Sequence, residues 1–202
     1  MDCQRGGYVH RRHDRIRDLV AKILDDVGHE TRIEPPLQPL SGEVLAEGSN
    51  VKVEARLDIA TRSFWQSDEM AFFDIRVFNP FAKSHINTNL EVLFRSQEKI
   101  KKTAYNDRVI KIEHGSFTPV ILSALGGTSL ETGKFLGRLI QKVAEKKSME
   151  KSVVANYIRT KISFELIRSQ VAMIRGSRSL KAMNMDTNDA ELVNQAAGIR
   201  DH

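Results

Sequence analysis

The sequence predicts a mixed α/β domain in which a small sheet is flanked by helices, with additional helices at its C-terminal end. Apolar residues recur at helical spacing near both ends of the chain, and β-prone segments of period two lie between them. The chain has 202 residues, of which 41% are hydrophobic and 28% charged, as is ordinary for one globular domain. Helices before, between and after the strands are typical of a sheet covered by helices.

The N-terminal part of the chain predicts a helix, a short strand and a loop. Residues 10–27 carry apolar side chains at helical spacing, and Gly28 is a natural stop. Residues 31–34 form a short strand candidate that two consecutive prolines end, because proline cannot donate to a strand ladder. Residues 37–50 are rich in proline and glycine and are expected to form a loop.

The central part predicts a β-hairpin followed by a helix. Residues 51–64 alternate with period two, and residues 70–78 are strongly β-prone. The connector 65–69 is short and polar, so the two strands are expected to pair as a hairpin. Residues 87–107 place apolar side chains on or near one face, which predicts a helix.

The C-terminal part predicts two more strands and two long helices. Residues 109–113 and 118–125 are the strand candidates, and residues 130–147 and 152–175 read as amphipathic helices. From Gly176 onward the chain is polar and is expected to be frayed or disordered.

The charge distribution favours a nucleic-acid partner. The net charge is +5, and residues 134–181 hold twelve Lys or Arg against three Glu, whereas residues 182–202 hold four acids and one Arg. Such a basic stretch fits a phosphate backbone, although a solvated helix face is the plain alternative. The single Cys3 excludes an internal disulfide. No apolar run has the length of a membrane span or a signal peptide, so no membrane partner and an intracellular location, nuclear or cytoplasmic, are expected.

Two carboxylates, Asp58 and Asp74, stand inside the predicted apolar strands, where a charge is costly unless it is paired or bound to metal. Their midpoint is Gln66, so a hairpin turning there places them opposite one another on one face, with Cβ atoms about 5 Å apart. A divalent cation removes the repulsion between them, and Mg²⁺ prefers one or two carboxylates with waters and phosphate oxygens. The pair is therefore a candidate metal site, with a buried ion pair as the alternative.

Cationic and aromatic side chains are expected around this pair. Arg76 follows Asp74 by two residues, so both share a strand face on which the guanidinium would hold a phosphate. Lys101 and Tyr105 are four residues apart on the next predicted helix and share one of its faces. A plain Asp–Arg pair and a solvated lysine beside a packed tyrosine are the alternatives. Two further cations of this helix are candidate nucleic-acid contacts: Lys99 and Lys102.

Polar residues crowd the start of the first predicted helix. Asp14 and His13 are candidates to enter the same cleft and assist the metal, and Arg12 and His13 are candidate nucleic-acid contacts. Asp14 is equally explained as a helix-start residue that the helix dipole favours. Zinc binding by Cys3, His10 and His13 is a weak alternative, because these spacings lack a second cysteine pair.

In chain order, these residues resemble the PD-(D/E)xK nuclease superfamily. The resemblance is carried by the helix acid Asp14, the strand acid Asp58, the Asp74-Ile75-Arg76 motif, and a Lys101…Tyr105 pair similar to that of lambda-type exonucleases. It implies a restriction-endonuclease-like core that hydrolyses a DNA phosphodiester. Asp58 and Asp74 would then hold Mg²⁺ or Mn²⁺, Arg76 and Lys101 would neutralise developing charge, and Tyr105 would position the backbone.

A closer resemblance, over roughly residues 3–125, is to the restriction-like endonuclease region at the C-terminus of LINE-type retroelement polyproteins. Its motifs are short: Cys3…Gly6-Gly7, Arg12-His13-Asp14, Glu34-Pro35, Ala55-Arg56-Leu57-Asp58 and Phe73-Asp74-Ile75-Arg76-Val77. In such proteins a zinc knuckle often precedes this region, so Cys3 would be its last ligand and no intact zinc site is expected. The resemblance also implies a polymerase domain of a parent polyprotein as a partner.

This resemblance suggests a division of the chain. Residues 1–9 would be the remnant of an upstream zinc knuckle or linker, residues 10–180 the nuclease-like domain, and residues 181–202 a polar, disordered tail. The chain would thus be a fragment that begins just inside the knuckle.

Two positions depart from the superfamily pattern: Leu57 stands where proline is usual, and Arg76 stands where lysine is usual. An arginine stays protonated and cannot act as a general base, so Lys101 or a metal-bound hydroxide is the expected substitute. Three alternatives stay open. They are a DNA- or RNA-binding module that has lost catalysis, a decayed structural fragment whose basic helices only pack, and a metal-dependent exonuclease that acts on free ends.

Overall fold

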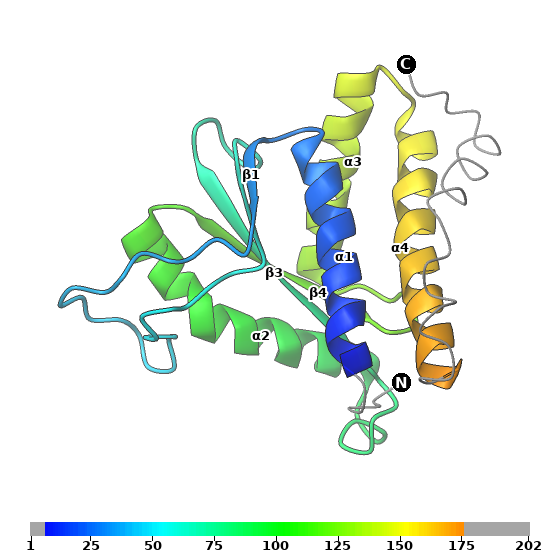
Figure 1. The fold of residues 1–202 in the computed structure, drawn as a ribbon, viewed down its shortest axis with the longest axis horizontal. Coiled ribbons are helices and arrows are strands. Elements are labelled where there is room, and N and C mark those ends of the chain that lie inside the picture. Colours follow the sequence, from blue (N-terminus) through cyan, green and yellow to red (C-terminus); the bar gives the residue numbers. More distant parts are fainter. Residues whose placement is uncertain (1–6, 176–202) are drawn as a thin grey trace.

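The structure, a computed structural model, describes residues 7–175 and contains a four-stranded sheet with helices on both of its faces (Figure 1). The elements are a helix, three strands, a helix, one strand and two helices, which is the predicted order except that one of the two strands expected after the second helix is helical. The mixed α/β class is therefore confirmed. The expectations for residues 1–6 and for the polar tail after Arg175 lie outside the described residues.

The bounds of the elements agree closely with the sequence prediction at most places. The helices and strands are α1 (Tyr8–Asp25), β1 (His29–Ile33), β2 (Ile59–Arg62), β3 (Met70–Phe78), α2 (Leu90–Arg108), the π-helical segment η2 (Val109–Glu113), β4 (Ser116–Ser123), α3 (Leu130–Lys147) and α4 (Lys151–Arg175). Within residues 7–175, no helix is both long and apolar enough to cross a membrane.

The sheet has the order β1-β2-β3-β4. Strands β1 to β3 are antiparallel, and β4 runs parallel to β3 after the crossover helix α2. Ile59 pairs with Phe73 and Arg62 with Met70, so the β2–β3 ladder is centred on Gln66 as predicted.

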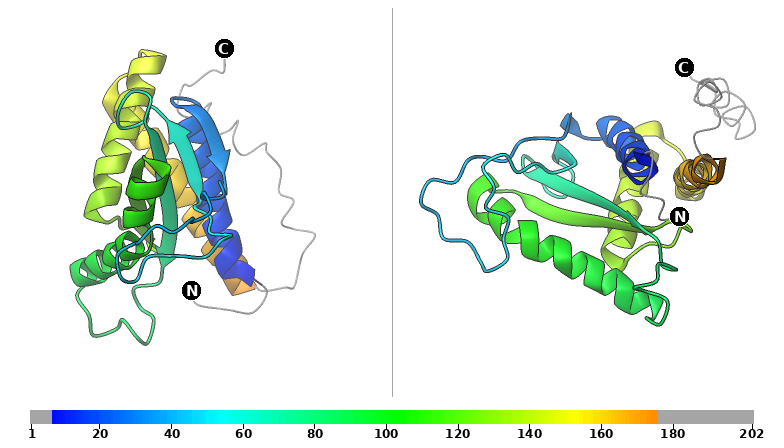
Figure 2. Two further views of the ribbon diagram at one scale, coloured as in Figure 1. Left: turned by 90° about the vertical axis from the view of Figure 1, so that its left-hand side faces the viewer. Right: turned by 60° about the horizontal axis from the view of Figure 1, so that its bottom comes forward.

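Alternate residues of β3 enter two different cores. Phe73, Ile75 and Val77 pack in the main core with α1, α3 and α4, whereas Phe72 lies on the other face with residues of α2 and η2. Figure 2 shows α2 covering one face of the sheet and the other three helices covering the opposite face. This alternation places Asp74 and Arg76 on the α2 side.

Two strand predictions were wrong. Residues 51–58 precede β2 in an extended loop, because β1 ends at its prolines and leaves only an isolated bridge there; Val51 and Val53 are exposed. The segment Val109–Glu113 continues α2 as a π-helical turn, although its alternating β-branched residues favour a strand. Val109 and Ile112 are its buried residues, which is a helical spacing, and His114 ends the helix in the left-handed region at φ 51°.

Arg108, at the end of α2, fixes the long loop that leads to Asp58. Its side chain is fully buried, and it donates to the carbonyl oxygens of Gln38 (2.9 Å), Asn50 (2.7 Å) and Lys52 (2.8 Å). These carbonyl oxygens have no partner in a neighbouring strand, so the Arg108 guanidinium supplies the hydrogen bonds that strand pairing would otherwise provide.

We expect Arg108→Met to lower the free energy of unfolding by about 2–4 kcal/mol, because three charge-assisted hydrogen bonds to backbone carbonyls are lost. Urea denaturation followed by circular dichroism measures this change. Arg95→Met, on the exposed face of the same helix, is the control and should change stability by less than about 0.5 kcal/mol. Equal, small effects of both substitutions would contradict the role given to Arg108.

Candidate functional site

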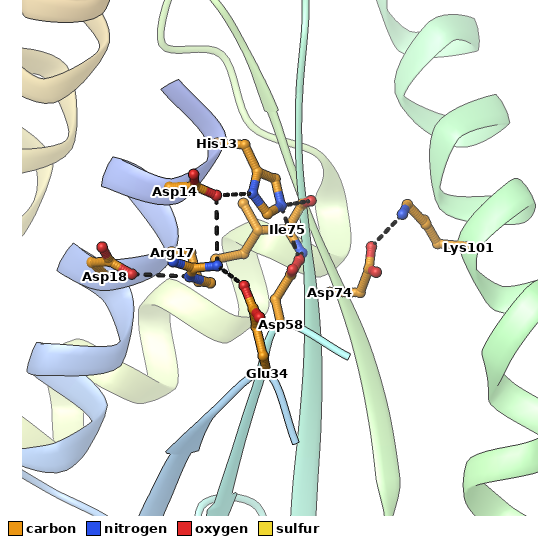
Figure 3. A network of polar contacts seen from close by, with 9 residues as sticks. All are labelled: His13, Asp14, Arg17, Asp18, Glu34, Asp58, Asp74, Ile75 and Lys101. Atoms are coloured by element: carbon orange, nitrogen blue, oxygen red, sulfur yellow. Dashed lines mark hydrogen bonds and ion pairs between the residues drawn. The ribbon is translucent and has the colours of Figure 1, made fainter. Parts of the chain in front are cut away.

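The site begins where the β2–β3 ladder stops. Beyond Ile59 the edge of β3 has no strand partner, and the Asp58 side chain takes the place of one: its Oδ2 accepts a hydrogen bond from the Ile75 backbone N–H at 2.6 Å. His13 of α1 reaches the same point, with Nε2 3.1 Å from Asp58 Oδ2 and 3.0 Å from the Ile75 carbonyl oxygen (Figure 3). Asp58 and His13 together therefore satisfy the free edge of β3.

His13 is held in its charged form between two carboxylates. Its pKa is raised to about 9, mainly by the hydrogen bond to Asp58, against the opposing effect of burial. Asp14 adds to this shift, because its Oδ1 lies 3.2 Å from His13 Nδ1. Both ring N–H groups therefore donate at neutral pH, and the imidazolium offsets the negative charge of Asp58.

Asp74 lies on the other side of the strand. Its side chain is buried, and Lys101 of α2 forms an ion pair with Oδ2 at 2.7 Å. Burial raises the pKa of the Asp74 carboxyl, the nearby Lys101 lowers it, and the charge of Asp58 raises it again. The effect of Asp58 means that the two carboxylates are near enough to repel each other.

The two carboxylates contact different helices. The predicted register is confirmed, but Asp58 stands just before β2 and its side chain turns along the open edge of β3 to His13, whereas Asp74 faces Lys101 (Figure 3). The two carboxylates therefore do not lie side by side on one face as expected. Asp58 pairs with His13 and Asp74 pairs with Lys101.

The other predicted site residues of β3 and α2 lie around Asp74. Arg76 is half-buried on the α2 side and makes no ion pair within the described residues. The Lys101 ammonium is 5.9 Å from the centre of the Tyr105 ring, and the Tyr105 hydroxyl accepts a hydrogen bond from Asn50 Nδ2 at 3.2 Å. Lys99 is exposed, and Lys102 pairs with Glu131 at 3.5 Å.

Arg12 does not reach this surface. It is only 2% exposed and donates to the Val77 carbonyl oxygen at 3.2 Å, so in the structure it joins α1 to β3. It is therefore left out of the nucleic-acid surface considered below.

Sequence reasoning did not find the support of the His13–Asp14 pair. Arg17, one helical turn further along α1, forms ion pairs with Asp14 (3.5 Å), Asp18 (2.9 Å) and Glu34. The four-residue spacing of His13 and Arg17 is the sequence signal for a shared helix face. Only the fold brings Glu34, at the end of β1, to that face.

Carboxylates are the side chains that magnesium prefers, and the acids of this site are the buried Asp74 and the partly buried Asp58, each with a protein cation beside it. Asp74 Oδ2 is taken up by the Lys101 ammonium at 2.7 Å, and the charge of Asp58 acts on the same carboxyl by raising its pKa. Within residues 7–175 no group of three or more His, Cys, Asp or Glu residues gathers as in an all-protein cage. Magnesium is commonly held by one or two carboxylates together with waters and substrate phosphates.

No protein-family model matches the sequence, and no curated protein matches it significantly.

We expect the free energy of unfolding to fall as the pH rises from about 6.5 to about 9. The charged His13 stabilises the folded state fully at a pH below its pKa in the unfolded chain, and this stabilisation is lost as the pH rises through its pKa in the folded chain. His13→Gln should make this fall in the free energy of unfolding smaller by about 1–3 kcal/mol. Chemical denaturation at a series of pH values measures it. His10→Gln, an exposed site on the same helix, should leave the slope unchanged, and an unchanged slope in His13→Gln would refute the assignment.

Proposed function

We propose that the chain is a metal-dependent DNA endonuclease with a restriction-endonuclease-like core. The observation that carries this proposal is a buried carboxylate, Asp74, in the central part of the sheet, paired with Lys101 and under the influence of the charge of Asp58. Arg76 stands on the same face of β3, two residues further along. Burial of an acid in this way opposes folding, and perturbed acids with charged partners are typical of catalytic sites.

In this proposal the side chains of the site bind the metal ion and neutralise negative charge on the phosphate. Asp58 and Asp74 would hold Mg²⁺ or Mn²⁺, and His13 and the Ile75 N–H fix the orientation of Asp58. When bound, the metal ion lowers the pKa of a water molecule and polarises the phosphodiester.

Arg76 and Lys101 stabilise the negative charge that develops on the phosphate, since both cations lie on the α2 side of β3. Tyr105 positions the DNA backbone beside Lys101, and Asp14 acts through His13. The exposed Lys99 and the partly exposed Lys102 extend the positive surface along α2.

The arrangement of elements supports the same proposal. A helix, an antiparallel pair with one acid just before its first strand and one inside its second, and a parallel strand after a crossover helix occur in the order that the resemblance to PD-(D/E)xK nucleases implies. We extend the proposal to a retroelement-derived origin, with DNA as substrate, RNA as a possible second ligand and a polymerase domain of a parent polyprotein as partner.

We expect the chain to nick supercoiled plasmid in Mg²⁺ or Mn²⁺, and Asp74→Asn to abolish nicking, because one ligand charge is lost. In the absence of DNA, Mg²⁺ should raise the Tm of the wild type by about 2–4 °C and leave that of Asp74→Asn unchanged. Asp68→Asn, in the exposed hairpin turn, is the matched control. Equal nicking by wild type and Asp74→Asn would show that the hairpin is not the site.

We expect Lys101→Met to reduce nicking by at least about 100-fold, since a charged donor beside the reacting phosphate contributes several kcal/mol. Lys99→Met, two residues away and exposed, should retain activity to within about threefold. Arg76→Lys tests the departure from the superfamily pattern: a faster reaction would mean that the guanidinium limits catalysis. Full activity of Lys101→Met would remove this residue from the mechanism.

A second candidate is a nucleic-acid-binding module that has lost catalysis. It is favoured by one observation: His13 and Lys101 already offset the charge of both carboxylates without a metal. In that case plasmid binding would persist in EDTA, weaken steeply with salt and never lead to nicking.

A further inference from the structure

Helix α4 is apolar on two opposite sides. One side is buried in the main core by Val154, Ile158, Ile162 and Leu166. The opposite side leaves large apolar side chains in solvent, with exposed fractions of 50% for Phe164, 55% for Ile167, 39% for Val171 and 85% for Ile174. A helix repeats every 3.6 residues, so these form a second stripe away from the core. The outer stripe consists of Val153, Thr160, Phe164, Ile167, Val171 and Ile174, together with Tyr157, which is partly buried and also packs against the main core.

The spacing of the outer stripe is that of a coiled-coil seam. Its members follow one another in alternating steps of four and three residues from Val153 to Ile174. A repeat of 3.5 residues is what a helix needs to keep one narrow seam against a second helix. A face that lies on a membrane or on a sheet is usually wider than such a seam. A contiguous apolar patch of this kind marks an interaction site.

The charges beside the outer stripe define its partner. Lys161, Arg168 and Arg175 follow one edge of the stripe at intervals of seven residues, and the other edge carries the uncharged Asn156, Ser163 and Gln170. The only acid of α4 is Glu165, which already pairs with Arg15 (3.7 Å) and Arg168 (3.6 Å). The Lys161 ammonium also lies 5.4 Å from the centre of the Tyr157 ring. The edge nevertheless carries three cations against one acid, so electrostatic complementarity favours acidic residues on the helix that covers it.

A second copy of α4 fits less well. In an antiparallel pair, the cationic edges of the two copies would face each other and place Lys161 against Arg168. In a parallel pair, Tyr157 and Phe164 would each meet their own counterpart, where two-stranded coils favour β-branched residues, and the cations would face uncharged side chains.

We propose that the outer stripe of α4 is the docking surface for an amphipathic helix of a partner protein, with an apolar heptad seam flanked by acidic residues. This surface lies on α4, whereas the proposed nuclease site is built on α1, β3 and α2. The proposal is therefore independent of the catalytic one.

The experiment uses the full chain and two labelled synthetic peptides of 22 residues, both with leucine and isoleucine at the seam positions. One peptide has glutamate and the other lysine at the flanking positions. We expect fluorescence anisotropy to show binding of the glutamate peptide at least about tenfold tighter than binding of the lysine peptide, and this difference to shrink in high salt. Ile167→Glu should weaken binding of the glutamate peptide at least about tenfold.

Ile167 is exposed, so its substitution leaves the core intact; an unchanged circular dichroism spectrum and Tm check this. Val92→Glu, an equally exposed apolar residue on α2, is the matched control and should bind as the wild type does. Absence of binding, or equal binding of both peptides, would overturn the proposal. Two other outcomes would also overturn the proposal. One is self-association of the chain in sedimentation equilibrium that Ile167→Glu abolishes, and the other is adsorption to anionic vesicles that the same substitution abolishes.

Discussion

The hydrogen bonds that Asp58 makes to the Ile75 N–H and to His13 are the contacts on which the site depends. Three parts of the chain meet there: the first helix, the loop before β2 and the middle of β3. The β2–β3 ladder stops at Ile59, the residue after Asp58, so these contacts replace the strand pairing that a longer β2 would supply. Arg108 holds the loop that precedes Asp58 through its hydrogen bonds to three backbone carbonyls of that loop.

Charge balance explains why the fold tolerates this arrangement. A buried carboxylate opposes folding unless a cation accompanies it, and each of the two acids has one: an imidazolium for Asp58 and an ammonium for Asp74. The raised pKa of Asp74 shows that its compensation is incomplete.

Local pattern predicted most of the fold, and tertiary contacts decided the rest. The bounds of β3 and α3 follow from periodicity, and the pairing register follows from a polar connector centred on Gln66. The alternation in residues 51–57 failed, because a strand also needs a partner and β1 is too short to provide one. Helical spacing separates Arg12 from Arg17: Arg12 stands four residues before Ile16 and eight before Val20, on the buried apolar row of α1, whereas Arg17 lies off that row and faces the site.

The order in which the chain is made gives α4 a particular importance. The strands are hydrogen-bonded in their order along the sequence, so the sheet and α2 can assemble as the chain emerges. Helix α1 is made first, yet it packs against α4, which is the last described element. Until residues 151–175 leave the ribosome, part of the apolar side of α1 has no cover, and the nascent chain passes through a stage that is open to aggregation or to chaperone binding.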